Sequence, residues 1–181
     1  MNGFAFLRNA MRDRGIGAVT RSSRMTIARV IGALPSPCAR IVEYGAGDGV
    51  ITEALLAHLA SGATLYGIER NPAFLRDLGR IRDPRFRLCA GDVRSEMAAL
   101  FAQTGGGFDA IVSSLPLAMF TPDERASVVQ VARDALRPGG RFIVCQYTPL
   151  ILPLLRAHFH HVRIRTAFWN FPPYLVMVAT R

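Results

Sequence analysis

The chain has 181 residues, half of them hydrophobic, and carries a formal net charge of +9. This length suits one domain with a sizeable core, because domains commonly have about 100–150 residues. No apolar run approaches the roughly 20 residues of a transmembrane helix, and the N-terminal residues lack the features of a secretory signal. The three cysteines are far apart, which favours reduced thiols in a cytosolic protein over a disulfide framework or a metal site.

All 22 basic residues are arginine. They outnumber the 13 acids, so the chain is expected to be attracted to polyanions. Nucleic acid and an anionic membrane surface both fit this expectation, and charge alone does not choose between them.

The first element in chain order is an N-terminal helical extension, expected over residues 1–35, ahead of the main domain at residues 36–181. Phe4, Leu7 and Met11 recur at helical spacing, and arginines lie on or near the opposite face. Such an amphipathic helix can lie in the interface of an anionic bilayer. Most helices of this kind instead cover a protein core, so both roles stay open.

Strands and helices alternate through the rest of the chain. Strands are predicted at residues 39–44, 64–68, 85–89, 108–113, 140–146, 162–167 and 174–179. Helices are predicted at residues 22–34, 49–60, 72–82, 94–103, 122–136 and 149–158. Because strands separated by helices form parallel units, we expect an α/β fold with a seven-stranded, mostly parallel sheet and helices on both faces. Ligands bind to such a sheet at the carboxyl ends of its strands.

A glycine-rich segment, IVEYGAGDGVIT at residues 41–52, joins the first of these strands to the helix after it. Gly45, Gly47 and Gly49 let the backbone turn sharply and present N–H groups to a ligand at the helix N-terminus. Glu69, twenty residues after Gly49, ends the next strand, where an acid can accept hydrogen bonds from two ribose hydroxyls. Together these residues indicate an adenosine cofactor.

The acid before the glycines narrows the choice of cofactor. Glu43 would repel a pyrophosphate but suits the ammonium and sulfonium cations of S-adenosylmethionine. The segment resembles the first motif of class I S-adenosylmethionine-dependent methyltransferases, which have a Rossmann-like fold. In that class an acid after the third strand accepts from the adenine amino group, and Asp92 matches this position; a helix N-cap is its alternative role. The predicted cofactor-binding set also includes the bordering residues Arg70, Val93 and Ser113.

The turn SSLPL, at residues 113–117, bears on the methyl acceptor. It is similar to a segment in which methyltransferases of adenine or cytosine carry Asn or Asp, then Pro or Leu, then Pro, then an aromatic. There the Asn or Asp accepts from the target amine, and the aromatic stacks on a flipped base. Ser114 and Leu117 stand at these two positions, so the side chains that hold a flat base are absent.

From about residue 15 to its end, the chain resembles the bacterial phospholipid N-methyltransferases of the soluble, S-adenosylmethionine-dependent type, relatives of the ribosomal RNA adenine dimethylases. The resemblance is carried by GIGAVTRSSRMTIARVI, VEYGAGDGVIT, YGIERNPAFLRDL, SSLPL, LRPGGRFIVCQYTP and WNFPPYLV. The chain departs from the family at Ala46, Asp48, Ser114 and Tyr174. That family methylates the amine of phosphatidylethanolamine on the way to phosphatidylcholine.

The resemblance implies an acceptor site with Ser114, Leu115 and Tyr147, and Trp169 and Tyr174 are further candidates to contact the headgroup. Aromatic faces there would stabilise a cationic nitrogen. We expect a monomer that binds phospholipid rather than nucleic acid. It would be cytoplasmic and peripherally associated with the inner face of the cytoplasmic membrane, through the N-terminal helix and an arginine-rich face.

Two alternatives stay open. An RNA adenine N6-methyltransferase would account for the charge of +9, although Ser114 and Leu117 disfavour it. A non-enzymatic protein that binds the cofactor and docks on membranes would have the same cofactor motifs. No metal is expected, because the four histidines lack the spacing of metal ligands.

Overall fold

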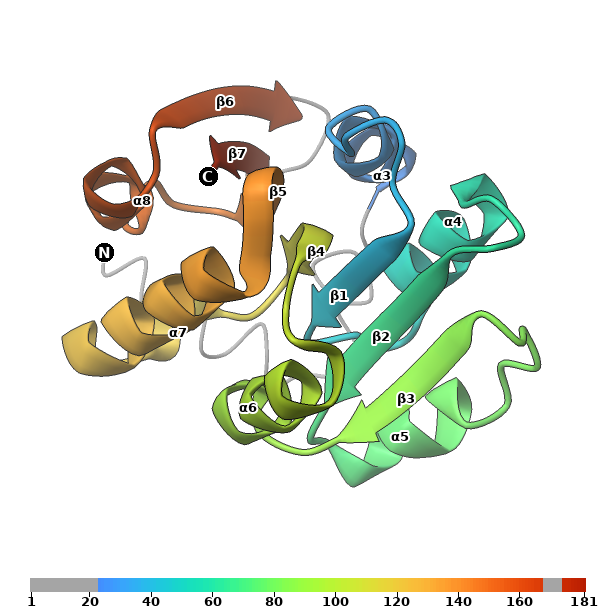
Figure 1. Cartoon of the computed structure of the whole chain (residues 1–181). Coiled ribbons are helices and arrows are strands. Elements are labelled where there is room, and N and C mark those ends of the chain that lie inside the picture. The colour runs from blue at the N-terminus through green and yellow to red at the C-terminus, as the bar shows by residue number, and fades with distance from the viewer. Residues whose placement is uncertain (1–22, 168–173) are drawn as a thin grey trace.

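Figure 1 shows the computed structural model, which describes residues 23–167 and 174–181. The predicted amphipathic helix around Phe4, Leu7 and Met11 lies outside the described residues, and so does Trp169. Their roles therefore stay predictions.

The centre of the molecule is one seven-stranded sheet with the order β3-β2-β1-β4-β5-β7-β6. Its strands are β1 (Arg40–Tyr44), β2 (Thr64–Glu69), β3 (Phe86–Ala90), β4 (Phe108–Ser113), β5 (Leu136–Gln146), β6 (His161–Ala167) and β7 (Tyr174–Thr180). The first five strands pair in parallel, and β7 runs antiparallel between β5 and β6. The predicted seven-stranded, mostly parallel sheet is confirmed.

The strand β5 begins earlier than the predicted residue 140. Its pairing with β4 starts at Leu136 opposite Phe108, and the register shifts before Arg141 pairs with Ala110. Proline and glycine interrupt regular pairing without ending a strand at such a bulge. The preceding helix consequently ends at Ala135 rather than 136.

The helices are α3 (Arg24–Ile31), α4 (Val50–His58), α5 (Pro72–Leu78), α6 (Val93–Thr104), α7 (Pro122–Ala135) and α8 (Leu152–His158), with a short 3₁₀ helix η1 (Leu117–Met119). At the N-caps of α3, α5, α6 and α7, side chains accept backbone N–H groups and fix where these helices start. Thr121 does so with Glu124 in a capping box at α7. Five helices are shorter than predicted, namely α3, α4, α5, α7 and α8. The helix α3 ends before its cap Gly32 and α5 before its cap Gly79.

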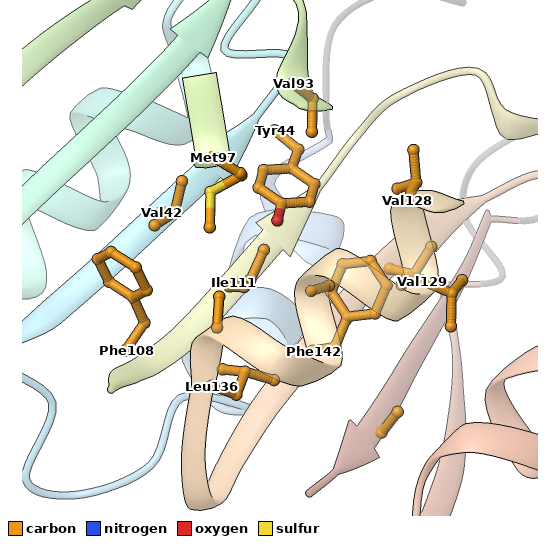
Figure 2. Close-up of a cluster of buried hydrophobic side chains, with 14 of the residues drawn as sticks. Val42, Tyr44, Val93, Met97, Phe108, Ile111, Val128, Val129, Leu136 and Phe142 are labelled. Carbon is orange, nitrogen blue, oxygen red and sulfur yellow. The ribbon is translucent and has the colours of Figure 1, made fainter. Parts of the chain in front are cut away.

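The helices cover both faces of the sheet, as predicted. On one face, side chains of α6, α7 and α8 bury Tyr44, Ile111 and Phe142 of the sheet, and Figure 2 shows the Tyr44 ring within this cluster. The rings of Tyr44 and Phe142 meet edge to face, with centroids 6.1 Å apart. On the other face, α3, α4 and α5 pack against Ile41 and Ile143. Because helices cover both faces of the sheet, a ligand is expected at the strand ends.

Within the described ranges, no helix is both long and apolar enough to cross a membrane. The same part of the chain contains no group of three or more His, Cys, Asp or Glu side chains that could hold a metal ion.

Candidate active site

The candidate site lies at the carboxyl ends of β1 and β4, where the strand order of the sheet reverses. Ligands of doubly wound sheets bind at this switch point. The loop after β1 is residues 45–49, here called the glycine loop, and the turn after β4 is residues 114–117, here called the acceptor turn. The Ser114 hydroxyl donates to the Gly45 carbonyl at 2.7 Å, so the two segments are in direct contact.

The glycine loop has a backbone that only glycine adopts readily. Gly45, Gly47 and Gly49 have φ angles of 73°, 56° and 83°, in the left-handed region that disfavours other residues. The Gly45 N–H donates to the Ile68 carbonyl at 2.9 Å and so ties the loop to β2. A Cβ built on Gly47 would have the Gly45 carbonyl oxygen, at 3.9 Å, as its nearest described neighbour. The loop therefore has open space in front of Gly47.

Glu69 ends β2 with its carboxylate against this loop. Its Oε2 accepts from the Gly47 N–H at 2.9 Å, and its Oε1 accepts from the backbone N–H groups of Arg70 and Asn71, each at 2.8 Å. Three backbone donors thus fix the acid beside the glycines. A carboxylate oxygen has more than one lone-pair site, so hydroxyl donors can still bind. Contact with a ribose stays a prediction.

Glu43 is buried beneath the loop, with a relative exposure of 1%. The Thr52 hydroxyl of α4 donates to its Oε2 at 2.6 Å, while Oε1 has no hydrogen-bond partner among the described residues. Burial raises the pKa of Glu43 to about 8, and the negative charges of Asp48 and Glu69 add to the rise, although the Thr52 hydrogen bond opposes it. The carboxyl group therefore keeps its proton at neutral pH unless a cation approaches.

Asp92 is the N-cap of α6, which is the alternative role that the sequence allowed for it. Its Oδ1 accepts from the Arg94 backbone N–H at 3.0 Å and from the Arg94 Nε at 2.9 Å. The Arg94 hydrogen bonds hold the pKa of Asp92 below its usual range. Arg70 lies 3.8 Å from the other carboxylate oxygen. The Val93 side chain is buried in the core cluster of Tyr44 (Figure 2). Adenine contacts by these residues stay predictions.

The acceptor turn is held by its own polar groups. Ser113 ends β4 with a buried hydroxyl that has no hydrogen-bond partner among the described residues. The Ser114 N–H donates to the Tyr44 carbonyl at 3.1 Å, and the Ser114 hydroxyl is engaged with Gly45. Leu117 packs into the core with a relative exposure of 1%. Ser114 therefore positions the turn, and Leu117 does not face a substrate.

Gln146, the last residue of β5, belongs to the site although the sequence assigned it no role. Its Nε2 donates to the Leu115 carbonyl and to the Cys145 carbonyl, each at 2.7 Å. The Leu115 carbonyl also accepts from the Leu117 N–H at 2.8 Å. A substrate amine that used this carbonyl would compete with Gln146. The segment CQYTP carried a family resemblance at this position, but the contact of Gln146 with Leu115 spans 31 residues and has no local pattern.

Tyr147 follows Gln146 and packs against Tyr174 at the start of β7. Their ring centroids lie 4.4 Å apart at an interplanar angle of 64°. Tyr147 is half-buried. Burial raises the pKa of both hydroxyls, so both are protonated at neutral pH. The structure thus brings these two predicted headgroup candidates together beside the carboxyl end of β5.

The residues present fit S-adenosylmethionine. The glycine loop leaves open space, Glu69 is fixed beside it with acceptor oxygens, and Glu43 has an unpartnered buried oxygen of the kind that a cationic ligand would satisfy. The glycine loop, Glu43 and Glu69 would hold this cofactor.

The fold and this site are those of a Rossmann-like protein that binds a nucleotide cofactor. Comparisons with known proteins identify its family. The methyltransferase domain family matches residues 42–142, more than half of the chain. The chain belongs to this family of methyltransferases.

A curated relative is the demethylmenaquinone methyltransferase of Corynebacterium kroppenstedtii, which is 33% identical over 120 residues. The match covers 66% of this chain and 47% of the relative. The chain therefore spans about half the length of the curated relative that it matches.

Solved structures share the fold at low sequence identity. The 1,6-didemethyltoxoflavin-N1-methyltransferase of Burkholderia thailandensis, with S-adenosylhomocysteine bound, has a TM-score of 0.69 at 22% identity, over 98% of this chain and 86% of its own. Human methyltransferase-like protein 13, also with S-adenosylhomocysteine, has a TM-score of 0.67 at 17% identity, over 84% and 79%. A TehB-like methyltransferase of Corynebacterium glutamicum has a TM-score of 0.64 at 20% identity, over 99% and 100%. The predicted class I methyltransferase fold is confirmed, and the methyl donor is S-adenosylmethionine.

Proposed function

We propose that this methyltransferase acts on the amine of phosphatidylethanolamine, and on its mono- and dimethylated forms, at a membrane surface. The proposal rests on the family resemblance of the sequence and on the chemistry of the acceptor side. When bound, S-adenosylmethionine supplies an electrophilic methyl group for in-line transfer to a nucleophile. The residues of the chain have to hold a neutral amine about 3–3.5 Å from that group.

One observation carries the proposal: neither of the two positions that would hold a flat base, 114 and 117, has a side chain free to contact it. Leu117 occupies the place of the stacking aromatic and is 1% exposed. Ser114 occupies the place of the amine-binding amide, and its hydroxyl is used by the Gly45 carbonyl. A small, flexible amine suits such a turn better than adenine or cytosine.

The tyrosine pair supports an acceptor that becomes cationic. Each methyl transfer to an amine adds positive charge on nitrogen, and an aromatic face within about 6 Å stabilises such a cation. Tyr147 and Tyr174 offer two rings in edge-to-face contact, and Tyr147 directly follows Gln146, which donates to the Leu115 carbonyl of the acceptor turn. Because burial raises the pKa of both hydroxyls, neither is a base at neutral pH, but each can accept a hydrogen bond from an ammonium group.

The test is transfer of label from methyl-labelled S-adenosylmethionine to phosphatidylethanolamine vesicles, with the lipid products identified by mass spectrometry. We expect mono-, di- or trimethylated lipid, and no label in vesicles that lack an amine. Parallel reactions contain demethylmenaquinone, the compound in the relative's name, and ribosomal RNA. Label in one of those and none in the amine lipid would overturn the proposal.

A further inference from the structure

Two exposed apolar side chains border the acceptor turn. Met119 ends η1, directly after the turn, and is 56% exposed. Leu150 follows β5 and is 48% exposed. We call these two residues the apolar lip. Because β4 and β5 are adjacent parallel strands, the segments that follow them leave the same edge of the sheet, and Gln146 links the segments through the Leu115 carbonyl.

The lip is presented by well-anchored backbone. Leu117 and Ile151, one or two residues from the exposed side chains, are both buried in the same core cluster. The Arg125 guanidinium donates to the Phe120 carbonyl at 2.9 Å, which holds the chain between η1 and α7. Met119 and Leu150 therefore stay exposed without any loss of core packing.

The charges next to the lip disfavour a polyanionic partner. Asp123 and Glu124 lie in the first turn of α7, directly after this segment, and Glu124 is held there by the N–H of Thr121 at 2.8 Å. Arg125 follows them, so this turn carries two carboxylates and one guanidinium, and its net negative charge would repel a nucleic-acid backbone. Hydrocarbon is the partner that gains most from contact with Met and Leu side chains.

We propose that Met119 and Leu150 enter the acyl layer of a membrane while the site works on a lipid amine at its surface. The inference rests on the proposed function, because the lip continues directly from the acceptor turn and a lipid amine is tethered to the bilayer. Binding through the lip is hydrophobic, so it persists at high salt and does not require anionic lipid.

The experiment uses the full chain and flotation with vesicles of phosphatidylethanolamine and phosphatidylcholine in 0.5 M salt. Met119→Asp and Leu150→Asp should each lower the vesicle partition coefficient by about tenfold or more, since each removes an apolar side chain from the bilayer and adds a charge. Phe101→Asp is the matched control: Phe101 is 48% exposed, but it lies near the end of α6, away from the strand ends that form the site. It should leave binding unchanged.

Met119→Gln and Leu150→Gln accompany the Asp variants, and thermal unfolding checks that each variant folds. Calorimetric affinity for S-adenosylmethionine should equal that of the unaltered protein. Equal flotation of the lip variants, the Phe101 variant and the unaltered chain would overturn the inference. Flotation needs no catalysis, so a failure of the proposed function appears separately, as absence of methylation of short-chain, monomeric phosphatidylethanolamine by the unaltered protein.

Discussion

The two halves of the site are built differently. In the donor half, formed by the glycine loop, Glu43 and Glu69, backbone N–H groups of the loop donate to the Ile68 carbonyl and to the Glu69 carboxylate of the neighbouring strand. The acceptor half depends on side chains from distant segments, such as Gln146 on the Leu115 carbonyl. Donor binding and acceptor binding can therefore be damaged separately, because the halves meet mainly where Ser114 and Leu115 contact Gly45.

The largest effect should come from the donor half. Glu69→Ala removes the acceptor of three backbone N–H groups and the predicted ribose acceptor, so affinity for S-adenosylmethionine should fall about a hundredfold or more. Titration calorimetry measures this. Glu53→Ala, an exposed acid on α4, is the control and should leave the affinity unchanged. Unaltered affinity in the Glu69 variant would remove this residue from the cofactor site.

The acceptor half is tested by Gln146→Ala. Loss of the hydrogen bond to the Leu115 carbonyl frees the acceptor turn, so kcat/KM for the acceptor should fall about tenfold. Affinity for S-adenosylmethionine should change little, because the Gln146 side chain donates to Leu115 and Cys145 rather than to the glycine loop. Gln130→Ala, on the exposed face of α7, is the control. Equal losses of donor and acceptor binding would show that the two halves are not separable.

Glu43 makes the donor half sensitive to pH. Its folded pKa of about 8 lies above its ordinary value of 4.5, so between these values the folded state holds a proton that the unfolded state has released. The free energy of unfolding should therefore fall as pH rises through this window, by up to about 1.4 kcal/mol per pH unit. Glu43→Gln should flatten this slope in denaturant titrations from pH 5 to 8. The same slope in both proteins would contradict a protonated Glu43.

The smallest effect on stability is expected at Tyr44, the residue next to Glu43. The Tyr44 hydroxyl is buried without a hydrogen-bond partner among the described residues, and such a group costs roughly 1–3 kcal/mol. Tyr44→Phe should therefore raise the free energy of unfolding by about 1 kcal/mol, with donor and acceptor binding unchanged. A lower stability in urea unfolding would mean that the hydroxyl has a partner, such as ordered water.

The sequence predicted the donor half because its signal is local. Three glycines at alternate positions predict a sharp turn, and their φ angles are positive as such a turn requires. The acid ends the next strand, which pairs with β1 in parallel. Helix caps such as Thr121 were equally visible, because a cap acts within a few residues.

The acceptor half could be predicted only in part. The identities of Ser114 and Leu117 disfavoured a base-stacking site, but the hydrogen bond from Ser114 to Gly45 joins residues 69 positions apart. The tyrosine pair joins Tyr147 to Tyr174 through antiparallel pairing of β5 and β7, which no short pattern encodes. The early start of β5 was missed because its Pro and Gly residues suggest a turn.

The substrate assignment is tested most directly by one competition reaction. The protein, methyl-labelled S-adenosylmethionine, phosphatidylethanolamine vesicles, demethylmenaquinone and ribosomal RNA are combined, and the label is followed into each acceptor. We expect label in the amine lipid, reduced by Glu69→Ala through donor affinity and by Gln146→Ala through acceptor turnover. Label in demethylmenaquinone or RNA, with none in the amine lipid, would contradict it.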